Sequence, residues 1–248
     1  MGKVKLKINN KDRGSCIHMS PVNHPEEVYL FSEQRLNELF HLKKEALPVG
    51  IDTSNITIEK FGSYGNFTHM TKQQEFEVEK NCMLFLQENY EDKYNINYFP
   101  FPVLINSHAE KRALEMSWCG QSILNLQRAD RMFSETYFTN KEDNKFIQNI
   151  NEQIDNILFN LDKNNIFYFD LKAANVCISP AGYISLIDFG KVLVSEPNAT
   201  EITFSYNHRP TRTEKIGERC INRIKHFKKL KWKFNVIVET FKNTIYGE

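Results

Sequence analysis

Two short segments, Tyr168-Phe169-Asp170-Leu171-Lys172-Ala173-Ala174-Asn175 and Ile187-Asp188-Phe189-Gly190, carry the most specific pattern in this 248-residue chain. Asp170 precedes Asn175 by five residues and Asp188 by eighteen. Between the two parts, runs rich in β-branched and aromatic residues flank Pro180-Ala181-Gly182, a pattern that predicts a β-hairpin. Because a hairpin folds the chain back on itself, we expect the side chains of Asp170, Asn175 and Asp188 to converge on one small volume.

This pattern resembles the catalytic loop and the magnesium loop of the eukaryotic-type protein kinases, H-R-D-L-x-x-x-x-N and D-F-G. The resemblance implies that Asp170 is the catalytic base for the attacking hydroxyl and that Lys172 steadies the transferring phosphoryl group. It also implies that Asn175 and Asp188 hold Mg²⁺, a cation that prefers oxygen ligands. ATP and Mg²⁺ are therefore the expected cofactors.

The resemblance further implies an α+β fold with two lobes in a single domain that spans 1–248. The β-rich N-lobe would comprise about 1–116, the hinge 117–120 and the mainly helical C-lobe 121–248. Few residues follow Gly190 for a lobe of this family, so we expect an abbreviated C-lobe. A charged fraction of 25% and a hydrophobic fraction of 41% fit such a domain, and no linker or repeat divides the chain.

Two residues depart from the family pattern, because Tyr168 and Phe169 stand where histidine and arginine are usual. The missing arginine is the residue that would pair with a phosphorylated activation loop, which argues against that form of regulation. The segment 203–211 resembles the end of an activation loop, with Thr211 in place of the usual glutamate. The region that docks a peptide substrate is thus curtailed.

Upstream of the catalytic loop, the stretch 114–123 resembles the strand and hinge that join the two kinase lobes. By this resemblance Met116 guards the back of the adenine pocket, and the hinge runs from Ser117 to Cys119. Cys177, two residues after Asn175, would lie under the adenine ring.

A kinase also needs a lysine on a strand that is paired with a glutamate on a helix. The alternating run 56–60 ends at Lys60 and predicts a strand, and the apolar face of 73–87 predicts a helix that carries Glu79. We favour the pair Lys60 and Glu79, with a cryptic phosphate-covering loop upstream of the strand.

The alternative takes Gly62-Ser63-Tyr64-Gly65-Asn66-Phe67 as the phosphate-covering loop, which makes Lys72 or Lys80 the lysine that contacts ATP. Two glycines are a weak motif and more often mark a plain turn. The choice among the three lysines stays open at this point.

Three further helical segments are predicted from the sequence. Apolar residues from Ile147 to Leu161 recur at helical spacing within 144–161, and Asn164-Asn165 would stop that helix. The other helices are expected over 32–46 and, as one or two helices, over 213–246.

The stretch from Arg219 to Lys233 carries seven basic residues among apolar ones. Its basic face is either solvated or docks an acidic partner, nucleic acid or an anionic membrane. Some short kinases need an activating partner protein, and such a partner would dock on this helix. The net charge of +1 gives no reason to expect nucleic acid, and no apolar run is long enough to span a membrane.

Five scattered cysteines are typical of free thiols in a reducing compartment, so we expect a cytoplasmic protein, inside a host cell if the source is a virus or a bacterial effector. The function that the resemblance implies is phosphorylation of serine or threonine hydroxyls of a protein substrate. A pseudokinase that binds a nucleotide or a partner is the alternative of another class. A small-molecule phosphotransferase and an enzyme that transfers AMP also remain open.

Overall fold

The computed structural model describes residues 3–8, 11–17, 56–61, 71–128, 137–138, 145–194, 201–204, 212–215 and 219–247. Within these ranges the protein combines helices with small antiparallel sheets, which confirms the α+β class. Three sequence predictions lie outside the described residues, and they are the helix 32–46, the glycine loop 62–67 and the activation-loop end 205–211.

The largest sheet has five strands in the order β2-β1-β3-β5-β4. Their bounds are β1 Lys3–Ile8, β2 Lys11–Ile17, β3 Ile56–Phe61, β4 Leu104–His108 and β5 Ala113–Ser117. The predicted strand that ends in Lys60 is thus confirmed as β3, at the centre of this sheet. Lys60 lies opposite Val4 of β1 and Leu114 of β5, so paired backbone on both sides fixes its position.

Helix α3 (Lys72–Asn89) confirms the helix predicted over 73–87. A capping box starts it, since Thr71 accepts from the Gln74 backbone and the Gln74 side chain accepts from the Thr71 backbone. Its buried face contains Phe76, Met83 and Leu86, together with the carboxylate of Glu79. A charged side chain that is buried in this way needs a partner inside the protein.

The other described residues form short strands and three helices. The strands are β6 Gln121–Ser122, β7 Ile166–Tyr168, β8 Val176–Ile178, β9 Ile184–Leu186, β10 Val192–Val194, β11 Glu201–Phe204 and β12 Arg212–Lys215. The helices are α4 Ile123–Arg128, α6 Lys145–Lys163 and α7 Arg219–Ile245, with 3-10 turns at Ala173–Asn175 and Phe189–Lys191.

The predicted hairpin around Pro180 is confirmed, because β8 and β9 pair antiparallel in the sheet β6-β8-β9. The prediction that helix starts at Thr213 is wrong. Residues 212–215 form β12, which pairs with β11, and α7 begins only at Arg219. Backbone pairing with a neighbouring strand here outweighs the local helical pattern, and β-branched Thr213 suits a strand.

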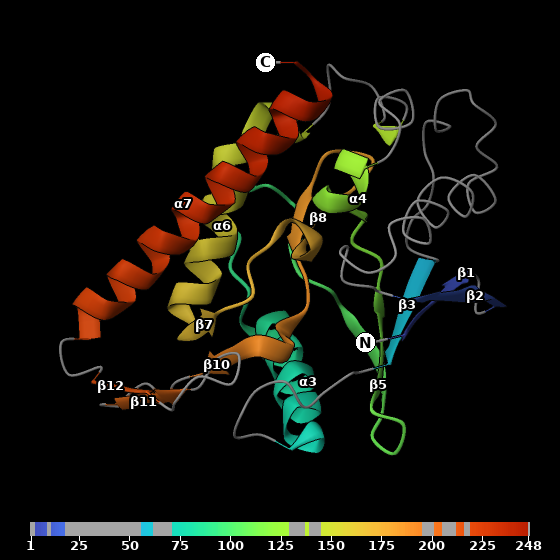
Figure 1. Cartoon of the computed structure of the whole chain (residues 1–248), viewed down its shortest axis with the longest axis horizontal. Coiled ribbons are helices and arrows are strands. Elements are labelled where there is room, and N and C mark those ends of the chain that lie inside the picture. The colour runs from blue at the N-terminus through green and yellow to red at the C-terminus, as the bar shows by residue number, and fades with distance from the viewer. Residues whose placement is uncertain are drawn as a thin grey trace.

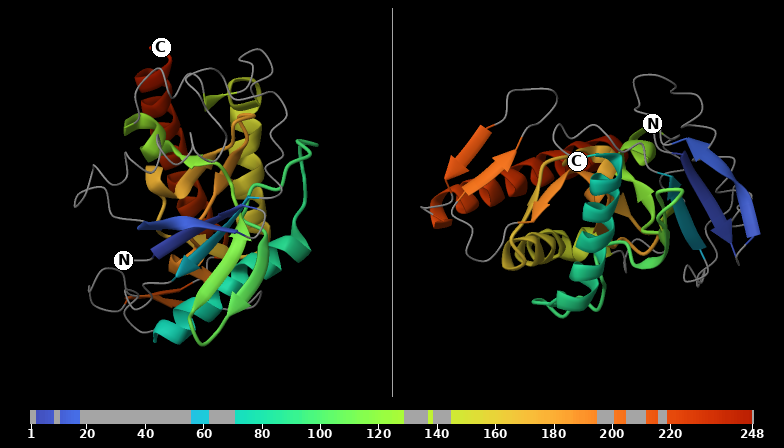
Figure 2. Two further views of the ribbon diagram at one scale, coloured as in Figure 1. Left: turned by 90° about the vertical axis from the view of Figure 1, so that its right-hand side faces the viewer. Right: turned by 90° about the horizontal axis from the view of Figure 1, so that it is seen from below.

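Figure 1 shows β1, β2, β3 and β5 on one side of the molecule and α6 and α7 side by side on the other, with α3 between them. The view from below in Figure 2 shows the same arrangement. Helix α6 packs against α7, and α3 contacts both the 3-10 turn Phe189–Lys191 and β10. In the described part of the chain, no helix has the length and apolar character that a membrane span requires.

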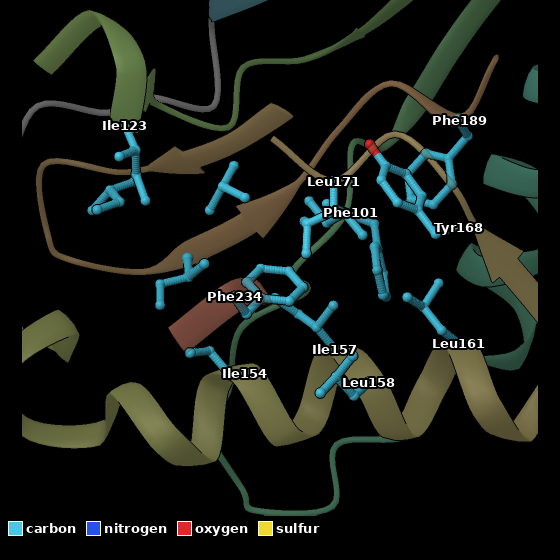
Figure 3. Close-up of a cluster of buried hydrophobic side chains, with 14 of the residues drawn as sticks. Phe101, Ile123, Ile154, Ile157, Leu158, Leu161, Tyr168, Leu171, Phe189 and Phe234 are labelled. Carbon is cyan, nitrogen blue, oxygen red and sulfur yellow. The ribbon is translucent and has the colours of Figure 1, made fainter. Parts of the chain in front are cut away.

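The core lies between α6 and the loop that precedes β8, as Figure 3 shows for Ile154, Ile157, Leu158 and Leu161. These four α6 residues are buried as predicted. Ile147, which was expected on the same stripe, is instead 45% exposed. The backbone of α6 is not helical at Asn149 (φ −125°, ψ 26°), which turns the first residues of the helix out of phase with the rest. The predicted stop is confirmed, since Asn165 adopts a left-handed conformation (φ 56°).

Two asparagines of α6, Asn156 and Asn160, and Asn164 just after its end form a buried ladder. Asn160 accepts from the Glu91 backbone N–H and donates to the Glu91 carbonyl, each at 2.9 Å. Asn156 accepts from the Lys93 N–H at 3.2 Å and donates to the Tyr90 hydroxyl at 2.8 Å. The backbone of the segment that follows α3 is therefore held on α6 by asparagine side chains.

Asn160→Ala should lower the free energy of unfolding by about 2–3 kcal/mol, because it leaves the backbone N–H and C=O of Glu91 without their hydrogen-bond partner. Urea unfolding would measure the change. Asn151→Ala, on the exposed face of the same helix, is the matched control and should change stability by less than about 0.5 kcal/mol. Equal stability of the two variants would contradict the role of the ladder.

Helix α7 packs on the residues that flank Tyr168 through His226, whose ring centroid lies 5.1 Å from that of Phe167 and 5.6 Å from that of Phe169. His226 Nε2 is buried and has no hydrogen-bond partner in the described ranges. Burial and the nearby Lys229 lower the pKa of His226 to about 4, against the opposing effect of Asp162. The neutral imidazole is thus the form that the fold accepts.

The folded-state pKa of His226 lies below its unfolded value of about 6.5, so its contribution to stability is complete above pH 6.5 and is lost as pH falls towards 4. His226→Phe should therefore lose less stability than the wild type between pH 7 and pH 5, by about 2 kcal/mol. Urea unfolding at several pH values checks this. Parallel stability curves for the two proteins would show that His226 titrates normally.

Candidate active site

The ammonium group of Lys60 joins three segments of the chain. Its Nζ atom lies 2.6 Å from Glu79 Oε1 on α3 and 2.7 Å from Asp188 Oδ1 at the start of the 3-10 turn Phe189–Lys191. The Lys60 side chain is 20% exposed, and that of Glu79 only 1%. Burial alone would lower the pKa of Lys60, but the carboxylates of Asp188 and Glu79 and their hydrogen bonds together raise it above its ordinary value. Lys60 is therefore held as a cation.

The ion pair predicted between Lys60 and Glu79 is thus present. The competing lysines lie elsewhere, since Lys72 is exposed at the first residue of α3 and Lys80 pairs with Glu77 on the same helix. Asp188 joins the pair as a third member. The sequence analysis predicted that Asp188 lies near Asp170 and Asn175, but it did not predict the contact of Asp188 with Lys60.

Asp188 adopts a left-handed backbone conformation (φ 66°, ψ 75°). This conformation is uncommon outside glycine, although aspartate tolerates it better than most residues. The next residue, Phe189, is fully buried, and its ring packs edge-on against Phe101 at 5.8 Å and Tyr168 at 5.7 Å. This aromatic packing holds the turn that directs Asp188 towards Lys60.

The second acidic group, Asp170, is nearly buried, with its side chain 8% exposed. Its Oδ2 atom lies 2.9 Å from Lys172 Nζ, 3.3 Å from Asn175 Nδ2 and 3.4 Å from Lys191 Nζ. For Asp170 Oδ1, the described residues supply no hydrogen-bond donor. One carboxylate oxygen is thus held by the protein, and the other is left to accept a hydrogen bond from outside.

Asn175 is fully buried, and its amide orientation is fixed by its neighbours. Nδ2 donates to the Asp170 carbonyl at 2.9 Å and lies near Asp170 Oδ2 and the Tyr168 hydroxyl. A flipped amide would set Oδ1 against the two Asp170 acceptors, so the observed orientation is the stable one. Oδ1 is then left buried with no partner in the part of the chain that the structure describes.

A buried amide oxygen without a donor is costly unless a ligand satisfies it. Because Asn175 Oδ1 and the Asp188 carboxylate are both oxygen donors on neighbouring turns, the residues present fit a hard cation such as Mg²⁺. The Ile187 N–H donates to the Asn175 carbonyl at 3.0 Å, which keeps the two turns together. The described ranges contain no group of three or more His, Cys, Asp or Glu residues suited to a metal ion, and this amide–carboxylate pair is of a different kind.

Tyr168, a departure from the expected sequence pattern, links the two turns. Its hydroxyl donates to the Ile187 carbonyl at 2.6 Å and lies 3.2 Å from Asn175 Nδ2. Sequence reasoning missed this role, and it also missed Lys191. The signals were a hydroxyl-bearing residue just before Phe169-Asp170 and a lysine directly after Asp188-Phe189-Gly190.

The predicted hinge residues lie where β5 ends. Met116 is 7% exposed, and Ser117 exchanges hydrogen bonds with the Val103 backbone at 2.9 Å. Cys119 and Cys177 are both buried, and burial raises the pKa of the Cys119 thiol to about 12. The contact of these residues with adenine stays a prediction.

Gly120 explains why the chain can pass so close to β8 after the hinge. It has a positive φ of 97°, and a Cβ atom there would lie only 2.1 Å from the Ile178 carbonyl oxygen. Any other residue would have to push β8 away. The backbone contact brings the strand that carries Cys177 directly against the predicted hinge.

No model of a known protein family matches this chain, and no curated protein matches it either.

Tyr168→Phe should weaken the site without unfolding the protein. The change leaves the Ile187 carbonyl without its donor and should cost about 1–3 kcal/mol in urea unfolding. It should also raise the Mg²⁺ concentration needed for ATP to stabilise the protein against heat, because the two oxygen-bearing turns lose their link.

The matched control is Tyr183→Phe, since the ring of Tyr183 stacks on Tyr98 and its hydroxyl makes no hydrogen bond to another described residue. A Tyr168→Phe protein with unchanged Mg²⁺ dependence would show that the hydroxyl does not position Asn175 and Asp188 for a cation.

Proposed function

We propose that this protein is an ATP- and Mg²⁺-dependent phosphotransferase with a bilobal, protein-kinase-like fold that phosphorylates serine or threonine hydroxyls of proteins. The observation that carries the proposal is the contact of Lys60 with both Glu79 and Asp188. A buried cation shared by a helix and a metal-binding turn is the arrangement that alignment of ATP phosphates requires.

Lys60 supplies the charge for the phosphates. Its raised pKa keeps the ammonium group protonated at physiological pH, and Glu79 fixes the direction of the side chain. Phosphate oxygens can therefore bind to a cation that is already oriented. This lowers the entropic cost of positioning the nucleotide.

Asn175 and Asp188 would hold the Mg²⁺ ion, which supplies charge neutralisation on the phosphate oxygens. The Tyr168 hydroxyl links the turns that carry these two residues and so fixes their relative positions. Phe189 holds the turn in place from the apolar side. These residues do not react, and their contribution is positioning and electrostatic stabilisation.

Asp170 would receive the acceptor hydroxyl at Oδ1, because Oδ2 is held by Lys172, Lys191 and the Asn175 amide. Lys172 would steady the transferring phosphoryl group from the same place. Leu171 and Lys172 after the aspartate support a protein hydroxyl as the acceptor, by the sequence resemblance.

A second candidate is a nucleotide-binding pseudokinase, and one observation favours it. The strands β1 and β2 lie upstream of β3 and pair with each other, yet Asn9 and Asn10 stand between them in the sequence. A loop that covers phosphates closely needs glycine, because only glycine lets the backbone approach them without a side chain.

The test is transfer from γ-labelled ATP in the presence of Mg²⁺, with and without cell extract. Label on this protein or on an extract protein should fall at least about 100-fold in Asp188→Ala and in Lys60→Met. Asp155→Ala and Lys72→Met are the matched controls, since Asp155 pairs with Lys231 on α7 and Lys72 is exposed, and both should stay active.

Stabilisation by ATP without transfer in any condition would favour the pseudokinase. Label that comes from α-labelled ATP instead would identify AMP transfer. Unchanged transfer by Lys60→Met would show that the wrong lysine is assigned.

A further inference from the structure

Backbone pairing places Lys191 beside the proposed catalytic base. Strand β10 pairs with β7 so that Val192 lies opposite Tyr168, and the Phe169 N–H donates to the Lys191 carbonyl at 3.2 Å. This register brings Lys191 Nζ to 3.4 Å from Asp170 Oδ2. The position is set by the sheet and not by a freely moving loop.

The two lysines on Asp170 are more accessible than the carboxylate that they share. The side chains are 47% exposed for Lys172, 27% for Lys191 and 8% for Asp170. A molecule that brings a hydroxyl to Asp170 therefore meets two partly exposed ammonium groups beside this carboxylate. Its charge next to the hydroxyl decides whether this approach is favourable.

Lys172 already has a role in the proposed reaction and already contacts Asp170 at 2.9 Å. Lys191 lies somewhat farther away, with its Nζ atom 3.4 Å from the same carboxylate oxygen. A lysine ammonium is well suited to bind a carboxylate of an incoming substrate, because it carries three donors on a flexible stem.

We propose that Lys191 recognises an acidic group next to the acceptor hydroxyl, so that the preferred substrate is a serine or threonine flanked by aspartate or glutamate. This inference rests on the proposed function. Consecutive Cα atoms lie about 3.8 Å apart, so an acidic residue within two positions of the acceptor reaches the ammonium group. A basic residue there would meet two lysines and be disfavoured.

The test uses the full-length protein with Mg²⁺ and ATP on a cell extract that has been heat-treated and dephosphorylated. Mass spectrometry then maps the phosphorylated positions. Aspartate and glutamate should be enriched about fivefold within two residues of the modified serines and threonines, the size expected for one half-exposed ion pair. Lys191→Met should abolish this enrichment, and Lys191→Glu should shift the preference to lysine and arginine.

Lys231→Met is the matched control, because Lys231 also pairs with an aspartate but lies on α7, away from the site. It should leave the sequence preference unchanged. Stabilisation of Lys191→Met by Mg²⁺ and ATP, as for the wild type, would show that the variant is folded.

Phosphorylation by the wild type without acidic enrichment would overturn the role of Lys191 and leave the proposed function standing. The same holds for an acidic preference that persists in Lys191→Met. Label found only on small molecules would overturn the peptide as acceptor. No transfer by the wild type would overturn the proposed function and the inference together.

Discussion

The cation of Lys60 is the constraint on which the candidate site depends. A largely buried ammonium group needs anionic partners, and here they come from a helix and from a turn that are far apart in the sequence. Loss of one partner of a fully buried ion pair costs about 3–5 kcal/mol, and the cost here is smaller because Asp188 is 31% exposed. The same contact thus holds β3, α3 and the Asp188 turn in one arrangement and sets the charge of the site.

Around this contact, Asn175 and Asp170 are each held by hydrogen bonds through one side-chain atom, and each has a second side-chain atom, an oxygen, that can accept from a ligand. The Asn175 amide donates to its neighbours through nitrogen, and Asp170 is held through Oδ2. Asn175 Oδ1 and Asp170 Oδ1 receive no donor from the described residues. Since most buried polar atoms in proteins are paired, the buried Asn175 Oδ1 next to Asp170 is a position suited to a ligand.

Much of this arrangement could be predicted from the sequence, because it rests on local patterns. The alternation before Lys60 and the apolar face around Glu79 predicted the strand and helix correctly, and the Pro-Ala-Gly turn predicted the β8–β9 hairpin. The contacts of Tyr168 and Lys191 depend on the register of β7 with β10, which no local pattern encodes. The β1–β2 hairpin was missed although Lys3 to Ile8 alternates lysine with apolar residues, a strand signal that was left unused.

The asparagine ladder fixes the position of the C-terminal end of α3, so a tilt of this helix would pivot about that end. The ladder forms hydrogen bonds to the chain just beyond Asn89. The other end of α3 has a capping box formed by the exposed residues Thr71 and Gln74. Glu79 lies ten residues before Asn89, which corresponds to about 15 Å along the helix axis. A tilt of about 10° around the ladder would therefore displace Glu79 by about 2.5 Å, enough to break its contact with Lys60.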